Sequence, residues 1–180
     1  MITLPCVAGG DCCLTVLCKN LFSKDVLIDT FLELKTLQIT EKEAWDLAFN
    51  ALVNNQTSED NAKEVADALV SAEFDGQAGH GLSRIPSYVE QLTAGKVKGT
   101  EAPSVISSKG SVVRVDAKNG FAYPAISLAL KEIKTACKKF GIAAASISRS
   151  HHFGQAGRHV EALAESGLIA LINLLVSVPL

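Results

Sequence analysis

The sequence predicts an α/β protein in which an N-terminal helical hairpin precedes part of a mixed or parallel sheet with covering helices. Between residues 40 and 93, apolar residues recur three and four positions apart, which is the spacing of one helix face. Beyond Pro103 the pattern changes to short apolar strands separated by turns that contain glycine. Farther on, a strand, a helix and another strand follow in order, which implies a parallel pair with a right-handed crossover.

The composition is that of a globular protein, with 180 residues, 48% hydrophobic and 20% charged, and a net charge of −2. No basic tract is present, so we expect no nucleic-acid partner. The longest apolar run, residues 168–176, is too short to span a bilayer, and we expect no membrane association. Four of the five cysteines crowd near the N-terminus without disulfide or zinc-site spacing, which predicts a cytoplasmic protein with reduced thiols.

Residues 1–35 differ from the rest of the chain. They begin without the positive region of a signal peptide, and Asp11 interrupts the apolar stretch that such a peptide requires. The apolar stretches 14–17 and 26–34 carry neither a helix cap nor a clear period. We therefore treat residues 1–35 as an unassigned N-terminal extension, with a genuine extra structural element as the alternative.

Three helices are predicted between residues 40 and 95. Thr40 and Glu43 form a capping box, in which each side chain binds a free amide of the first turn. Ser58 is predicted to cap the second helix, which completes the hairpin. Pro86 begins the third helix at a position where the first turn tolerates proline, and this helix continues until Gly95.

Short strands and turns follow the helical segment. Residues 104–107 and 111–115 predict two strands around a turn at Lys109-Gly110, and Asn119-Gly120 marks a further turn. Pro124 opens a long helix that Gly141 closes. The predicted core positions of this helix are Ile126, Leu130, Ile133, Cys137 and Phe140. The elements predicted after it are a buried strand at 142–147, a helix at 155–166 and a strand at 168–173.

The loop at residues 72–86 is the first candidate site. A helical pattern ends at Phe74, and three glycines follow within six residues. His80 lies between two of these glycines, on a bare loop that a ligand can approach closely. Arg84 follows with a planar guanidinium suited to binding a carboxylate in bidentate fashion. An enzyme of 2-oxo or 2-hydroxy acids needs such a pair. The alternative is a glycine-rich turn with a surface histidine and a solvated arginine.

Residues 148–157 form the second candidate site, between the end of a predicted strand and the start of a helix. Ligands usually bind there in α/β sheets, and free helix amides beside Gly154 and Gly157 are suited to holding a phosphate. No G-x-G-x-x-G follows any strand, so the standard dinucleotide fingerprint is absent. A metal bound by His151, His152, His159 and His80 is the alternative, but no carboxylate has ligand spacing, so we expect no metal site. His159 is predicted to lie on the surface of the following helix.

These segments together resemble the malate/L-lactate dehydrogenase family, whose members lack the common Rossmann fold. The family includes ureidoglycolate and sulfolactate dehydrogenases and the piperideine-2-carboxylate and pyrroline-2-carboxylate reductases. The resemblance runs from about Leu37 to Ala170. The matching blocks are residues 66–95 (ADALVSAEFDGQAGHGLSRIPSYVEQLTAG), 116–122 (DAKNGFA) and 142–157 (IAAASISRSHHFGQAG).

The resemblance implies an oxidoreductase that transfers a hydride between NAD or NADP and a small 2-oxo, 2-hydroxy or cyclic 2-imino carboxylate. It implies that His80 is the catalytic proton donor or acceptor and that Arg84 binds the substrate carboxylate. His152 is the alternative catalytic base. The residues that the resemblance places against the cofactor are His152, Phe153, Gly154, Gln155 and Ala156. It also implies a homodimer for a full-length protein.

The chain departs from the family in two respects. Many members carry a serine before the loop histidine, where this chain has Gly79. Members are also about twice as long, so we expect the N-terminal half of such an enzyme, truncated relative to the family fold. The expected division is an extension at 1–35, a helical segment carrying the catalytic loop at 36–100 and a partial cofactor-binding α/β segment at 101–180. A non-catalytic fragment without independent activity is the alternative.

Overall fold

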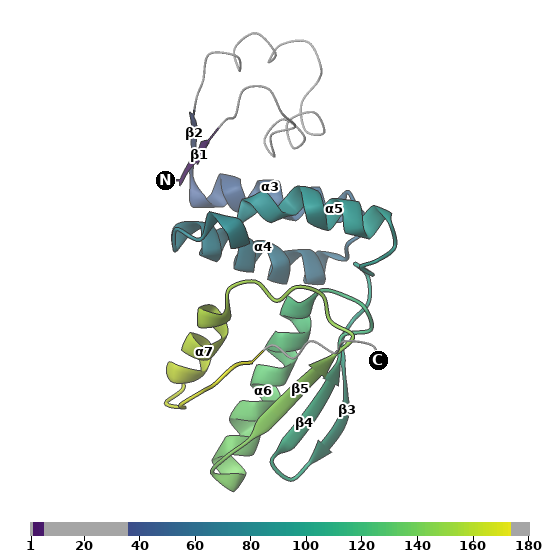
Figure 1. Cartoon of the computed structure of the whole chain (residues 1–180), viewed down its shortest axis with the longest axis vertical. Helices are drawn as coiled ribbons and strands as arrows, with labels where there is room; N and C mark the ends of the chain where they lie inside the picture. Colours follow the sequence, from purple (N-terminus) through teal and green to yellow (C-terminus); the bar gives the residue numbers. More distant parts are fainter. Residues whose placement is uncertain (1, 6–35, 174–180) are drawn as a thin grey trace.

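The computed structural model of the chain describes residues 2–5 and 36–173, most of which form two layers (Figure 1). The helical layer contains α3 (Glu41–Val53), α4 (Glu59–Phe74) and α5 (Ile85–Thr93). The α/β layer contains β3 (Ser104–Lys109), β4 (Val112–Asp116), α6 (Ala122–Phe140), β5 (Ala144–Ser148) and α7 (Ala156–Ala164). This arrangement confirms the predicted α/β class, with a helical hairpin and part of a mixed sheet.

The first residues of the chain form a strand. Strand β1 (Ile2–Pro5) pairs antiparallel with β2 (Thr36–Ile39), with Ile2 opposite Ile39. The predicted extension at 1–35 therefore begins with a regular element. The rest of that extension, residues 6–35 with the crowded cysteines, lies outside the described residues.

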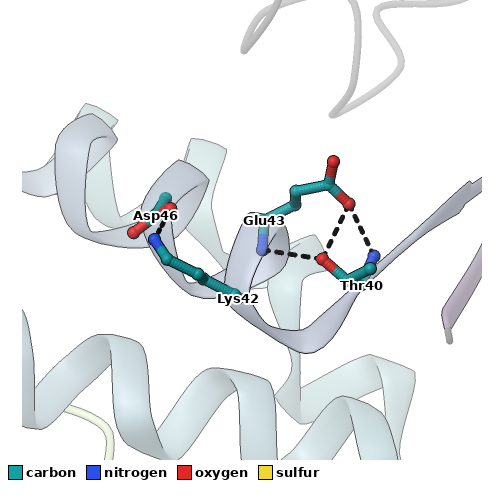
Figure 2. A network of polar contacts seen from close by, with 4 residues as sticks. All are labelled: Thr40, Lys42, Glu43 and Asp46. Carbon is teal, nitrogen blue, oxygen red and sulfur yellow. Dashed lines mark hydrogen bonds and ion pairs between the residues drawn. The ribbon is translucent and has the colours of Figure 1, made fainter.

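The start of α3 confirms the predicted capping box (Figure 2). The Glu43 amide donates to the Thr40 hydroxyl at 3.3 Å, and the Thr40 amide donates to the Glu43 carboxylate at 2.8 Å. The hydrogen bond from the Thr40 amide is the main reason that the pKa of Glu43 lies below its ordinary value. On the same helix, Lys42 and Asp46 form an ion pair one turn apart (Figure 2).

The start of α4 is stabilised differently from the prediction. Ser58 does occupy the N-cap position, but its side chain makes no capping hydrogen bond. Instead, the buried Asn61 amide donates to the carbonyl oxygens of Gly99 at 2.7 Å and Glu101 at 3.0 Å. The start of this helix is thus tied to the segment that enters the sheet, because buried carbonyls require hydrogen-bond donors.

The helical layer shares its core with the start of α6. Leu52, Leu69 and Ile85 are buried in it, and Phe121 and Tyr123 at the start of α6 belong to the same cluster. Burial of these aromatic rings fixes α6 against the helices, since large buried side chains contribute most to packing. The site described below lies at this junction.

The sheet has the order β3-β4-β5. Strands β3 and β4 form the predicted antiparallel hairpin, while β4 and β5 are parallel and joined through α6. The sequence predicted a parallel pair of strands at 142–147 and 168–173, joined through the helix at 155–166. The observed parallel pair is instead β4 and β5, joined through α6. The strand predicted at 168–173 is wrong, because these residues form no strand and pair with no described neighbour. Ile169 and Leu171 are exposed there, so their apolar character did not determine a strand.

Helix α6 covers one face of the sheet, and Val113 and Val115 are fully buried beneath it. The prediction that the strand around 142–147 is buried is wrong, because β5 lies at the sheet edge and its side chains alternate between half-buried and exposed. Ile142, just before it, is 74% exposed.

The predictions for the end of α6 and for its core positions are partly correct. Gly141 closes the helix in the left-handed conformation, as predicted. Among the predicted core positions, Ile126 is buried, whereas Phe140 is 45% exposed and that prediction is wrong. Phe140 lies in the last turn, where the Lys139 ammonium, rather than the core, approaches its ring. The other three positions are half-buried.

Helix α7 packs on α6, and α6 lies between α7 and the sheet (Figure 1). Arg158 of α7 donates a hydrogen bond to the Asp67 carbonyl of α4 at 2.7 Å, which ties α7 to the helical layer as well. None of the helices in the part of the chain that the structure describes has the length and apolar character needed to cross a membrane.

Candidate active site

Two loops that are far apart in the sequence meet between the layers. The His80 loop consists of two 3₁₀ turns, Ala78–His80 and Leu82–Arg84. The second loop, residues 149–155, connects β5 to α7. The rings of His80 and His152 stack with their centroids 5.6 Å apart and their planes inclined by 23°. The structure thus brings the two histidines of the separate sequence motifs together.

A side chain of α4 stabilises the His80 loop. The Glu73 carboxylate accepts a hydrogen bond from the Leu82 amide at 2.9 Å. A β-carbon at Gly81 would lie 2.1 Å from that carboxylate oxygen, so a side chain there would displace the Glu73 carboxylate from the Leu82 amide. The predicted glycine loop is thus an ordered turn whose residues 75–79 are exposed, while His80 is half-buried.

Arg84 is anchored beside His80. Its Nε donates to the Gly79 carbonyl at 2.6 Å, within the same loop. Its two terminal nitrogens donate no hydrogen bond to any residue among 36–173. The guanidinium also contributes to lowering the pKa of His152, so its charge acts on the histidine pair. Arg84 therefore has an anchored Nε and two terminal nitrogens without hydrogen bonds to residues 36–173, and its charge acts on His152.

The second loop is held by the turn that follows β4. The His151 amide donates to the Gly120 carbonyl at 3.2 Å, and the Asn119 amide donates to the Arg149 carbonyl at 2.8 Å. Arg149, in the left-handed conformation at φ +51°, pairs with Asp116. Hydrogen bonds from Arg149 are the main reason that the pKa of Asp116 is lowered. The block 116–122 thus positions His152 through backbone contacts.

A buried pair of tyrosines lies behind His152. The Tyr88 hydroxyl of α5 is 3.0 Å from Nδ1 of His152 and 3.1 Å from the Tyr123 hydroxyl of α6. Burial raises the pKa of both tyrosines, so both hydroxyls are protonated at neutral pH. Burial, followed by the charges of Arg84 and His80, lowers the pKa of His152. The imidazole of His152 is therefore neutral at pH 7.

His151 makes no hydrogen bond to either tyrosine or to the other histidines in the part of the chain that the structure describes. Its Nε2 is 2.7 Å from the Gln91 side-chain oxygen, and its Nδ1 is buried without a hydrogen-bond partner among the described residues. The side-chain nitrogen of Gln91 donates a hydrogen bond to the Ser87 hydroxyl at 3.0 Å, so the side-chain oxygen of Gln91 faces His151. Burial is the main cause that lowers the pKa of His151 to about 4. This neutral, half-buried histidine is a packing residue against Tyr88.

His159 is not the surface residue that the sequence predicted. It is 6% exposed, and its Nε2 donates to the Phe153 carbonyl at 2.9 Å. The prediction failed because α7 packs this side chain against Phe153 and Tyr123. Beside them, Gly154 is in the left-handed conformation, and a β-carbon there would lie 2.4 Å from the Tyr123 oxygen. Packing alone therefore requires glycine at 154.

The remaining residues of the second motif lie at the start of α7. Gln155 occupies the N-cap position, where its side chain donates to the Asp75 carboxylate at 2.8 Å instead of capping the helix. Its side-chain oxygen is buried without a hydrogen-bond partner among residues 36–173. Gly157, one position after Ala156, has open space where a β-carbon would lie. The first turn of α7 therefore has amides without a side-chain cap.

The sequence reasoning missed Tyr88, Tyr123 and Gln91. Arg84, Tyr88 and Gln91 are four and three residues apart, so they share one face of the helix that follows the His80 loop. A polar stripe that continues from a candidate site onto the next helix was the available signal. Tyr123 had no such signal, because only the fold places it beside Tyr88.

Comparison with protein families decides the relationship. The model of the malate/L-lactate dehydrogenase family matches residues 39–176, which is most of the chain. The chain belongs to this family. The match extends six residues beyond Ala170, the end of the resemblance that the sequence motifs indicate.

Relatives in this family include characterised dehydrogenases and reductases. The chain is 43% identical over 133 residues to the NADP(+)-dependent (2R)-3-sulfolactate dehydrogenase of Chromohalobacter salexigens, covering 74% of this chain and 40% of that protein. It is 38% identical over 136 residues to the Δ1-pyrroline-2-carboxylate/Δ1-piperideine-2-carboxylate reductase of Pseudomonas syringae pv. tomato, covering 76% and 40%. The chain thus spans about 40% of the length of these curated relatives.

Solved structures of the family share the fold. The crystal structure of Δ1-piperideine-2-carboxylate reductase from Pseudomonas syringae pv. tomato superposes with a TM-score of 0.69 at 36% identity, over 73% of this chain and 40% of that one. Malate dehydrogenase from Entamoeba histolytica also gives a TM-score of 0.69, at 26% identity, over 73% and 37% of the two chains. The two-layer arrangement is therefore the fold of the family's corresponding part.

Proposed function

We propose that this chain carries the acid/base and substrate-binding part of an oxidoreductase that transfers a hydride between NAD(P) and a small 2-oxo, 2-hydroxy or cyclic 2-imino carboxylate. The observation that carries the proposal is the meeting of His80, Arg84 and His152 between the two layers. The named substrates of relatives, a sulfolactate and two cyclic imino carboxylates, support this substrate class.

In this proposal His80 exchanges the proton. As the carbon accepts a hydride, the imidazole donates a proton to the attached oxygen or nitrogen, and it accepts one in the reverse direction. Arg84 binds the substrate carboxylate through its two terminal nitrogens, because its Nε is already bonded to Gly79. His152 remains the alternative base, since its ring stacks on that of His80.

We propose that His152, Phe153, Gly154, Gln155 and Ala156 contact the cofactor. The uncapped first turn of α7 and the buried, unpartnered oxygen of Gln155 fit a bound group with phosphates and hydrogen-bond donors. When bound, NADH or NADPH supplies the hydride. Glycine at 154 would contribute through the shape of the loop, because a β-carbon there would collide with the Tyr123 ring.

The wider organisation is proposed on the same basis. Residues 36–100 form a helical segment that carries the acid/base loop, and residues 101–180 form part of a cofactor-binding segment. The spacing of the cysteines, which predicts reduced thiols, supports a cytoplasmic location. The family resemblance supports a homodimer for a full-length protein.

A second candidate is that the chain has no independent activity. It spans about 40% of the length of its relatives. In addition, Ile142, Ile169 and Leu171 are exposed and β5 has an unpaired edge in the described sheet. Exposed apolar side chains near an open strand edge favour association or aggregation.

Titration of the chain with NADH and with NADPH, followed by an assay with piperideine-2-carboxylate and a 2-oxo acid, tests both candidates. Under the first, one nucleotide binds and is oxidised only with substrate, and His80→Ala binds the nucleotide with strongly reduced turnover. A chain that binds neither nucleotide contradicts the first candidate and favours the second. A monomer on size-exclusion chromatography with full turnover contradicts the second.

A further inference from the structure

The hydroxyls of Tyr88 and Tyr123 form a closed chain behind His152. Tyr88 is 1% exposed and Tyr123 is 4% exposed. The Tyr88 hydroxyl contacts His152 Nδ1 on one side and the Tyr123 hydroxyl on the other. The Tyr123 hydroxyl forms no other hydrogen bond within the part of the chain that the structure describes. The proton of the Tyr123 hydroxyl therefore has only the Tyr88 oxygen as an acceptor among the described residues, and the Tyr88 proton has only His152 Nδ1 or the Tyr123 oxygen.

Two orders of protons fit these distances. In the first, Tyr123 donates to Tyr88, and Tyr88 donates to Nδ1 of His152, so that every hydroxyl proton has an acceptor. In the second, Nδ1–H of His152 donates to Tyr88, and Tyr88 donates to Tyr123. The second order leaves the buried Tyr123 proton without an acceptor, which is costly for a desolvated donor. The first order is therefore the more stable one.

We infer that Tyr88, itself fixed by Tyr123, is a positioning residue that holds His152 in the tautomer with the proton on Nε2. In this tautomer the free lone pair of His152 lies on Nδ1 and faces Tyr88. Nε2 can then donate a hydrogen bond but cannot accept a proton. His152 is thus a hydrogen-bond donor to the ligand, and the proton exchange belongs to His80. This assignment of roles rests on the proposed function, whereas the tautomer does not.

The electrostatics of the site agree with this order. Protonation of His152 would place a proton on Nδ1, reverse both hydroxyl bonds and leave the Tyr123 proton without an acceptor. The groups that face His152 are His80 and Arg84 from the first loop, Tyr88 from α5 and its neighbour His151. Burial and two of these groups, Arg84 and His80, lower the pKa of His152, so the neutral ring that the tautomer requires is present at neutral pH.

Nitrogen NMR of the 180-residue chain labelled with ¹⁵N-histidine tests the tautomer directly at pH 7.5. The His152 signals are identified by their loss in His152→Gln. We expect Nδ1 without a proton and Nε2 with one. His151 provides an internal reference, because its Nε2 bonds to the Gln91 oxygen and not to either tyrosine. A protonated Nδ1 on neutral His152 would overturn the inference.

Two variants of nearly unchanged shape separate the two proton orders. In Tyr88→Phe, the Nδ1 resonance should move towards that of a nitrogen that accepts no hydrogen bond. In Tyr123→Phe, the tautomer should persist, because Tyr88 still donates to Nδ1. The reverse order predicts that Tyr123→Phe switches the tautomer, since the Tyr88 proton would lose its acceptor. Such a switch, or an unmoved Nδ1 signal in Tyr88→Phe, would refute the positioning role.

Kinetics distinguish failure of this inference from failure of the proposed function. In a preparation with turnover, Tyr88→Phe should lower kcat roughly 10- to 100-fold through misplacement of His152. Normal kcat in Tyr88→Phe would refute the positioning role and leave the function standing. If His152 has the Nε2–H tautomer but the protein binds no nucleotide, the inferred tautomer is upheld and the proposed function is contradicted.

Discussion

Gly154→Ala should destabilise the protein more than any ordinary glycine substitution in a turn. The backbone at Gly154 has φ +69°, and a β-carbon would lie 2.4 Å from the Tyr123 oxygen. The left-handed conformation costs a non-glycine residue roughly 1–2 kcal/mol. Displacing a rigid, buried ring adds about 1–3 kcal/mol, as for other overpacked cores. The two contributions sum to about 2–5 kcal/mol.

Gly76→Ala is the matched control. Its φ of +73° is nearly the same, but no atom lies within 4 Å of the added β-carbon. It should lose only the conformational contribution of roughly 1–2 kcal/mol. The excess loss in Gly154→Ala, about 2 kcal/mol, therefore measures the contact with Tyr123.

Urea unfolding monitored by circular dichroism gives both free energies of unfolding under identical conditions. If Gly154→Ala loses no more stability than Gly76→Ala, the packing argument is refuted. Gly154 would then be explained by approach of a ligand instead of by Tyr123. Cofactor affinity measured on the same variants completes the comparison, because a stable Gly154→Ala protein with weakened binding would identify a direct contact.

The remaining predictions concern the two loops. In a preparation with turnover, His80→Ala should reduce kcat by about 10²–10⁴-fold with the cofactor Kd preserved. Near-normal turnover in this variant would assign the proton exchange to His152 instead. Arg84→Lys should raise KM for a carboxylate substrate by roughly 10- to 100-fold, since the planar fork is lost, and an unchanged KM would show that Arg84 binds no substrate. Gly79→Ser should change the stability by less than about 0.5 kcal/mol, because open space surrounds its β-carbon position, and urea unfolding checks this. The pKa of His151 is lowered to about 4 from its ordinary 6.5, so the unfolded chain binds the extra proton between these values. Stability should therefore fall as the pH drops from 6.5 to 4, and a His151→Gln protein should show a shallower fall; an equally steep one would contradict the lowered pKa of His151.

Local features of the fold could be predicted because their causes lie within a few residues. The capping box at Thr40 and Glu43 and the left-handed stop at Gly141 involve a single helical turn each. His80 and His152 could be singled out for a similar reason, since loops beside helices carry many of the residues that bind ligands. Their mutual stacking followed only from the tertiary arrangement.

The sequence by itself determined the helical hairpin, the β3–β4 hairpin, the turns and the two histidine loops, because capping, periodicity and turn chemistry act at short range. Only the tertiary structure decided which residues surround the site. Tyr88 has the spacing of an ordinary core residue, and His159 has that of an ordinary helix residue. Whether each meets a hydroxyl, a carbonyl or water depends on which distant element packs against it. Residues 168–173 are the reverse case, since apolar character without a hydrogen-bonding neighbour forms no strand.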